Sequence, residues 1–141
     1  MEDQAIAQIE RRNPDSVHTP VGEYSHLARV ECAELIFLAG QVAVDPEGNF
    51  VGEGDIRAQA RQIYDNIGRL LEDAGTAWDN VVQLTTYIVG RENVPLFLEE
   101  RTKIINTLFP EGDFPPSTLL LIDGLFSEAA LAEVTTVAAI P

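Results

Sequence analysis

Two charged residues of this chain stand in apolar surroundings, where a charge needs a physical reason. Glu133 interrupts an apolar run that predicts a strand at residues 131–140. Burying an isolated carboxylate is costly, so Glu133 must be paired, exposed or functional. A partly buried carboxylate can act as a general acid or base towards water. The alternative interpretation is that the strand has one wet face and that Glu133 points into it.

Arg101 is the second such residue. Apolar residues at helical spacing predict a helix at residues 92–109, and Arg101 occupies a position of its apolar stripe between Leu98 and Ile104. A long arginine stem can pack along such a stripe while its guanidinium reaches water. The guanidinium can also bind a carboxylate, and we keep both interpretations open.

Three further side chains could contribute to a pocket. Ser117 and Thr118 follow two prolines at the start of a predicted strand, where they suit either a hydroxyl-lined pocket or ordinary polarity at a strand end. Tyr24 lies just before the first predicted strand of the domain, as a hydrophobic anchor or as a catalytic acid.

The sequence lacks the common catalytic signatures. His18 and His26 are its two histidines, without the neighbouring cysteine or the HExxH spacing of a zinc site. There is no GxSxG, no GxxxxGK[ST] and no GxGxxG, which excludes the commonest acyl-transfer and nucleotide-binding motifs. Cys32 is the single cysteine, so no intramolecular disulfide forms, and we expect a protein of the reducing cytoplasm.

The composition is that of one globular domain with an acidic surface. A chain of 141 residues with 45% hydrophobic residues can bury an ordinary core, and no apolar run is long enough to span a bilayer. The 23 acidic and 9 basic residues give a net charge of −14. Since nucleic acids and anionic membranes need a basic footprint, we expect neither as a partner.

Patterning along the chain predicts an α+β fold with two helices packed on one face of a mixed sheet. Residues 1–20 are expected to form an N-terminal arm, helical or loose, and residues 21–141 a single domain. The first three predicted strands should form two hairpins in succession, and a one-faced helix should run from Ile56 to Ala74, with Asp55 near its start and Gly75 after its end. The predicted strands span residues 25–31, 35–39, 41–44, 81–89, 117–122 and 131–140.

An ordered set of segments gives the chain a family resemblance over about residues 20–139. The most specific piece contains Gly40 and Gln41. The chain resembles the Rid (reactive intermediate deaminase, YjgF-like) family through residues 22–26, 38–48, 65–67, 71–75, 81–88, 115–118 and 131–134.

The resemblance implies a chorismate-mutase-like domain that assembles as a homotrimer, with ligand clefts between protomers. It also implies hydrolysis of enamines or imines to a carbonyl product and ammonia, without metal or cofactor. Carried over to this sequence, Tyr24 would line the cleft, Gly40 would offer its backbone near the ligand, and Glu133 would position or activate water. Apolar strands at residues 119–122 and 134–140 also favour burial against neighbouring protomers.

The chain departs from the family pattern where the ligand would be anchored. Deaminating members carry an arginine in a Pro-x-Arg-Ser/Thr motif, whereas this chain has Pro115, then Pro116 in the arginine's place, then Ser117 and Thr118. A family serine aligns with Ala39, and a family asparagine aligns with Leu98. Three polar ligand contacts have therefore become apolar.

Arg101 is the candidate replacement for the missing anchor. It lies three residues beyond Leu98 and so on the same helical face. We expect it to bind a carboxylate ligand or to pair internally with Glu133.

Two classes of function follow. The first is a RidA-like enamine or imine deaminase with an altered, less acidic substrate preference. The second is a non-catalytic trimer that binds a small molecule or a protein through the same cleft. Endoribonuclease activity, a label that some relatives carry, fits poorly with the net charge of −14.

Overall fold

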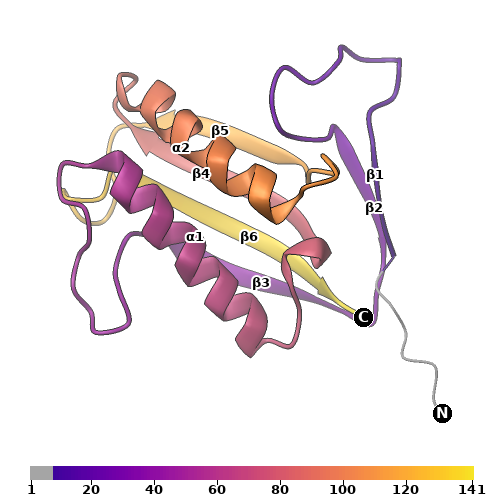
Figure 1. Ribbon diagram of the computed structural model, residues 1–141, viewed down its shortest axis with the longest axis horizontal. Coiled ribbons are helices and arrows are strands. Elements are labelled where there is room, and N and C mark those ends of the chain that lie inside the picture. The colour runs from indigo at the N-terminus through magenta and orange to yellow at the C-terminus, as the bar shows by residue number, and fades with distance from the viewer. Residues whose placement is uncertain (1–7) are drawn as a thin grey trace.

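The computed structural model describes residues 8–141, which form a four-stranded sheet, a separate two-stranded sheet and two helices (Figure 1). The four-stranded sheet has the order β3-β6-β4-β5. Strands β4 and β5 are parallel and are joined through a helix, whereas β6 runs antiparallel to both β3 and β4. The strands are β3 (Glu34–Gln41), β4 (Val81–Val89), β5 (Ser117–Ile122) and β6 (Ala132–Ile140).

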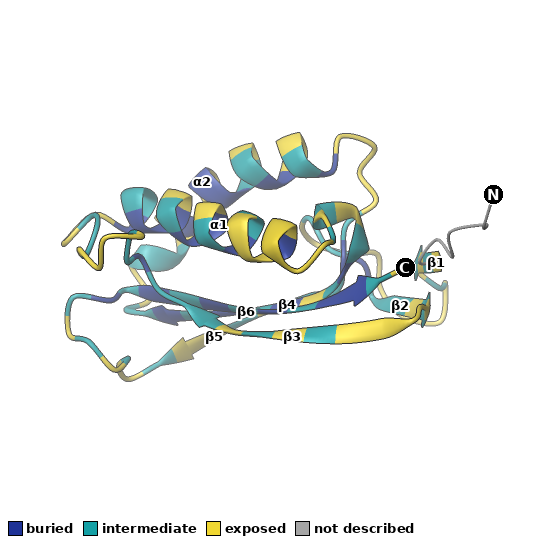
Figure 2. Cartoon of the chain, turned by 90° about the horizontal axis from the view of Figure 1, so that it is seen from below, coloured by how far each residue is buried: buried dark blue, intermediate teal, exposed yellow. Residues whose placement is uncertain are grey.

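Both helices, α1 (Ile56–Asp73) and α2 (Asn93–Leu108), cover the same face of this sheet, and the other face is bare (Figure 2). Helix α1 begins where the Asp55 carboxylate accepts hydrogen bonds from two backbone N–H groups, and it ends before Gly75, whose φ of +82° suits glycine. The predicted α+β fold, with two helices on one face of a mixed sheet, is confirmed. Within residues 8–141 no helix is long and apolar enough to cross a membrane.

Strand β6 divides its side chains between the two faces. Ala132, Val134 and Ala138 are buried under the helices in the hydrophobic core. Glu133 and Thr135, which alternate with them, lie half-buried on the bare face. This alternation places the carboxylate of Glu133 on the bare face of the sheet.

The N-terminal region differs from the prediction of a short helix or a loose arm. Its described part contains β1 (Gln8–Arg12), which pairs antiparallel with β2 (Leu27–Glu31). Strand β2 therefore does not form a hairpin with β3, which instead pairs with β6 near the C-terminus. The pattern of a single strand predicts its existence but not its partner, and this explains the error.

The expected strand at residues 41–44 is also wrong. Strand β3 runs on to Gln41 through an irregularity between Leu38 and Gln41, where its register against β6 shifts. After it, an isolated bridge between Val44 and Phe50 closes a tight turn. The chain here closes a short loop and not the second of the two predicted hairpins.

Arg11 fastens the two-stranded sheet to the domain. Its side chain is 4% exposed, and its Nη2 atom donates to the carbonyl oxygens of Asp79 at 2.9 Å and Val81 at 2.8 Å. Its Nη1 atom lies 3.1 Å from the Asp113 carboxylate, and the guanidinium covers the Phe109 ring. One buried guanidinium thus connects β1 to the start of β4 and to the loop after α2.

Gln59 ties two loops to helix α1. Its fully buried amide donates to the carbonyl oxygens of Gly52 at 2.9 Å and Ala129 at 3.0 Å, and it accepts from the Leu131 N–H at 2.8 Å. The loop that leads into β6 is therefore fixed just before Glu133.

Replacing Gln59 with leucine should lower the free energy of unfolding by about 3 kcal/mol, because three backbone groups lose their partner while an apolar side chain of similar size remains. Urea denaturation measures the change. The matched control is Gln62→Leu, because the Gln62 amide donates only to Asn66 and should cost less than about 1 kcal/mol. Equal losses in the two variants would contradict the role assigned to Gln59.

Candidate functional site

A cavity of about 700 Å³ lies between helix α2, the edge strand β5 and the segment 21–26 that precedes β2. We call it the α2–β5 cavity. Five of the residues singled out in the sequence line it, from three separate parts of the chain: Tyr24, Leu98, Arg101, Ser117 and Thr118.

Arg101 forms the charged part of the cavity wall. Its side chain is only 7% exposed. Its Nη2 atom donates to the backbone carbonyl of Glu23 at 3.0 Å and to the Ser117 hydroxyl at 3.3 Å, and its Nη1 atom lies 3.7 Å from the Glu23 carboxylate. The charge that interrupts the apolar stripe of α2 is therefore buried and compensated inside the protein.

The internal partner of Arg101 is Glu23 and not Glu133, which corrects that part of the sequence-based hypothesis. Helix α2 packs on the covered face of the sheet, whereas Glu133 lies on the bare face. The sheet itself separates the two side chains. A contact between them within one chain would require the side chains of β6 to alternate in the opposite sense.

Glu23 is itself held by helix α2. One carboxylate oxygen accepts a hydrogen bond from the Thr102 hydroxyl at 3.0 Å, and the other faces Arg101. Arg101 and Thr102, adjacent on the helix, thus hold Glu23 in place. Their contacts with Glu23 fix the wall of the cavity that residues 21–26 form.

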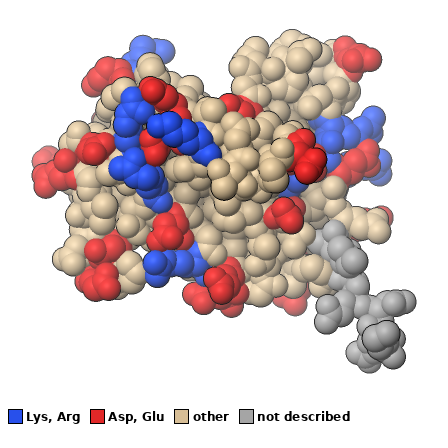
Figure 3. All heavy atoms as spheres, viewed as in Figure 1, with Lys and Arg blue, Asp and Glu red and all other residues tan. Residues whose placement is uncertain are grey.

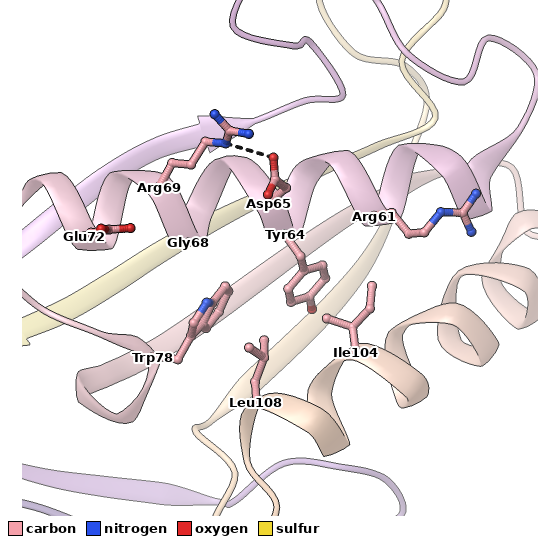
Figure 4. Close-up of a pocket in the computed structure, with 9 residues that line it drawn as sticks. All are labelled: Arg61, Tyr64, Asp65, Gly68, Arg69, Glu72, Trp78, Ile104 and Leu108. Atoms are coloured by element: carbon pink, nitrogen blue, oxygen red, sulfur yellow. Dashed lines mark hydrogen bonds and ion pairs between the residues drawn. The ribbon is translucent and has the colours of Figure 1, made fainter.

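Behind Arg101 lies Tyr64, whose hydroxyl is buried and makes no hydrogen bond. Figure 4 shows its ring pointing from α1 toward α2, beside Trp78 and Ile104, in a shallow groove of about 510 Å³ on the outer face. The Tyr64 and Trp78 rings are stacked with their centroids 5.6 Å apart. Burial raises the pKa of the Tyr64 phenol, and the nearby positive charge of Arg101 offsets part of that rise.

A second group of predicted site residues lies on the bare face of the sheet. Glu133 lies against Gly40 of the neighbouring strand, so closely that a methyl group on Gly40 would overlap its carboxylate. Tyr87 is opposite Glu133 on β4, on the other flank of β6. Ala39, next to Gly40, is exposed and adds no polar group. Only a glycine at position 40 lets the carboxylate lie over the backbone of β3.

The two prolines shape the start of β5. The Pro115 carbonyl accepts from the Ser25 N–H at 3.5 Å, and the Pro116 carbonyl accepts from the Leu84 N–H at 3.0 Å. Both contacts use backbone oxygens, so the prolines join the loop before β2 to the start of the parallel strand pair. Neither ring supplies a hydrogen-bond donor for a ligand.

Within one chain, the predicted site residues therefore form two groups on opposite faces. Edge strand β5 lies between them. Ser117 points to the covered face and bonds to Arg101, whereas Thr118 shares the bare face with Thr85 and Thr135, its neighbours in register on β4 and β6. Thr118 also borders the α2–β5 cavity, so this residue lies at the edge of the sheet where the two faces adjoin.

Sequence reasoning missed Glu23, Thr102 and Tyr64. The contact between Glu23 and Thr102 spans 79 residues, and no spacing rule connects a loop glutamate to a helix so far away. One signal was present, because a charge at a buried helical position requires an opposite charge nearby. That signal predicts a partner for Arg101 without saying which of the 23 acidic residues it is.

Comparison with known proteins supplies the family. The family described as endoribonuclease L-PSP matches residues 15–140. The chain belongs to this family. As a member of the L-PSP family, it is 30% identical over 123 residues to a RutC family protein of Synechocystis, covering 86% of this chain and 89% of the relative. It is also 32% identical over 96 residues to Protein HMF1 of Saccharomyces cerevisiae, covering 68% and 72%.

The fold of this L-PSP family member is similar to that of a solved structure. The crystal structure of YyfB from Yersinia pestis, described as a protein of unknown function of the conserved Rid family, superposes with a TM-score of 0.83. The two chains are 26% identical, and the match covers 94% of this chain and 98% of YyfB. The resemblance to the Rid family drawn from the sequence is confirmed.

The buried hydroxyl of Tyr64 gives a pH-dependent prediction. Tyr64→Phe should keep the free energy of unfolding or raise it by up to about 1 kcal/mol, because it removes a polar group without a partner. The raised pKa means that the folded chain keeps a proton which the unfolded chain releases above about pH 10. The wild type therefore loses stability as pH rises through that range, and Tyr64→Phe lacks this component. Urea denaturation at several pH values measures the difference, and a difference that stays constant with pH would contradict it.

Proposed function

We propose that this protein hydrolyses a small imine or enamine to a carbonyl compound and ammonia, at a cleft completed by two protomers. The observation that carries the proposal is the Glu133 carboxylate, which lies over Gly40 on a sheet face that no helix covers. Membership of a family that includes Rid proteins supports it.

The chemistry needs one group that moves a proton. Glu133 accepts one proton from water while the water oxygen bonds to the imine carbon, and it passes this proton to the imine nitrogen, which gives a carbinolamine. The carboxylate then accepts the hydroxyl proton of the carbinolamine and passes it to the amino nitrogen as the C–N bond breaks, so that ammonia leaves and the carbonyl forms. The backbone of Gly40 can lie close to the reacting atoms because no side chain covers it.

A second protomer would unite the two groups of site residues. The bare face carries large exposed apolar side chains, with Phe37 75%, Leu35 49% and Leu120 42% exposed. Covering such a face against copies of the same chain is favourable. In the homotrimer that we propose, Glu133 and Gly40 of one protomer would lie near the β5 edge of the next.

The substrate that suits this cleft is less acidic than a 2-imino acid. The wall of the α2–β5 cavity carries apolar side chains, and Pro116 offers no donor where the resemblance places an arginine. The exposed Leu98 side chain adds apolar surface at the cavity. A hydrocarbon chain on the substrate therefore finds matching surface.

RNA is a poor substrate for this surface despite the family's description. Figure 3 shows basic side chains lying against acidic ones over the helical face. Seven of the nine basic residues form ion pairs with acidic side chains within residues 8–141: Arg11, Arg12, Arg57, Arg61, Arg69, Arg101 and Lys103. Phosphate groups would have to displace these carboxylates in a protein with a net charge of −14.

Glu133→Gln should reduce ammonia release by at least about 100-fold, because the amide cannot accept the proton of water. The assay generates imines in situ from several amino acids, including ones with uncharged and apolar side chains, and measures ammonia above the rate in buffer. Glu128→Gln, which removes the same charge from the exposed loop before β6, serves as the control and should keep full activity. An absence of acceleration by the wild type across these imines would refute the hydrolase and favour the non-catalytic binding protein.

Phe37→Glu should convert the proposed trimer to monomer, because it places a charge among the exposed apolar side chains of the bare face. Light scattering at micromolar concentration measures the mass against the 15.5 kDa of one chain. Leu70→Glu, on the outer surface of α1, adds the same charge to the covered side and should leave the mass unchanged. A wild-type mass of one chain would refute the trimer.

A further inference from the structure

The α2–β5 cavity contains a positive charge that the protein neutralises itself. The Arg101 side chain is 7% exposed and forms part of the wall. Two of its Nη2 contacts are to neutral oxygens, those of the Glu23 backbone and Ser117. Its Nη1 atom faces one carboxylate oxygen of Glu23 at 3.7 Å. The guanidinium thus has an opposite charge beside it before any ligand enters.

Glu23 is held in this position by two independent contacts. Its other carboxylate oxygen accepts from the Thr102 hydroxyl at 3.0 Å, and its backbone carbonyl accepts from Arg101. The side chain is 28% exposed, so the carboxylate borders the space where a ligand would lie. Glu23 therefore faces Arg101 with both its carboxylate and its backbone carbonyl oxygen.

The rest of the wall has no lysine and no second arginine, and the His26 ring on it is bonded through Nε2 to the His18 carbonyl at 2.7 Å. Val94, Leu98 and Leu119 contribute apolar surface, and Thr86 and Ser117 contribute neutral hydroxyls. A ligand carboxylate would therefore compete with Glu23 for one guanidinium, at a distance where two like charges repel strongly in a partly buried site. An uncharged ligand meets no such competition.

We propose that Glu23 is a specificity-determining residue of this cavity. It occupies the anion-binding capacity of Arg101, so that the cavity accepts an uncharged carbonyl or imine with an apolar chain and rejects the corresponding carboxylate. This inference rests on the proposed function for the identity of the ligand class, and it assigns the discrimination to one side chain. Neutralising Glu23 should turn the cavity into a carboxylate site without any added positive charge.

A matched pair of probes tests the inference by binding alone. Pentan-2-one and 2-oxopentanoate share a propyl ketone and differ by a methyl group in place of the carboxylate. NMR titration of the full chain measures the dissociation constant of each. The wild type should bind pentan-2-one more tightly than 2-oxopentanoate. Glu23→Gln should bind 2-oxopentanoate at least about tenfold more tightly than the wild type does, with little change for pentan-2-one.

Two further variants make the outcome decisive. Glu47→Gln removes the same charge from an exposed turn and should leave both affinities unchanged, which separates a local effect from the change in net charge. Thr102→Val removes the hydroxyl that holds Glu23 and should raise the affinity for 2-oxopentanoate by a smaller factor, about threefold. This variant tests the inference even if Glu23→Gln fails to fold.

The inference is overturned if the wild type already binds 2-oxopentanoate as tightly as pentan-2-one. It is also overturned if neither Glu23→Gln nor Thr102→Val raises the affinity for the carboxylate. Because binding of either probe requires no turnover, the binding result is independent of the ammonia assay. If Glu23→Gln changes the binding preference while the wild type releases no ammonia, the specificity role of Glu23 is supported and the proposed hydrolase activity is refuted.

Discussion

Strand β6 holds the four-stranded sheet together and carries the Glu133 carboxylate on which the proposed hydrolysis depends. It lies between β3 and β4, so its backbone bonds to both neighbours, and each of its side chains must lie on one of two faces. Ala132 and Val134 are needed in the core beneath the helices. Glu133 between them has no other place than the bare face. The position of the carboxylate is thus a consequence of core packing, and Gly40 on β3 provides the space that the carboxylate needs.

Arg101 imposes the second constraint, because a buried charge must be compensated where it lies. In this chain the compensation comes from a loop close to the N-terminus, and it connects helix α2 to the segment before β2. The same pairing therefore stabilises the buried guanidinium and shapes a wall of the α2–β5 cavity. A ligand site built around a compensated charge differs from one built around a free cation, since its polarity is low even though it contains an arginine.

The sequence predicted some of these features and could not predict others. Composition and flanking residues predicted β4 and β5 with the bounds that the structure has, because the β-branched run at 81–89 and the apolar run at 117–122 are bounded by turn residues. The anomaly at Arg101 was visible because its neighbours define an apolar stripe. The partner of Arg101 could not be predicted, because Glu23 lies 78 residues away in a loop without periodicity. Strand β1 was missed for a related reason, since a short polar strand such as QIERR has no apolar alternation to reveal it.

The pairing of β1 with β2 has a consequence for the loop between them. Residues 13–26 leave one strand of the pair and return to the other, so both ends of this loop are fixed. Within the loop, the Asn13 side chain accepts from the His26 N–H at 2.9 Å, and the His26 ring contacts the His18 carbonyl at 2.7 Å. This loop carries Glu23, while Arg11, just before the loop begins, is bound to the start of β4. Residues 21–26 of this loop thus form one wall of the α2–β5 cavity, and changes in the loop's length or anchoring would alter the shape of that cavity while the hydrophobic core stayed intact.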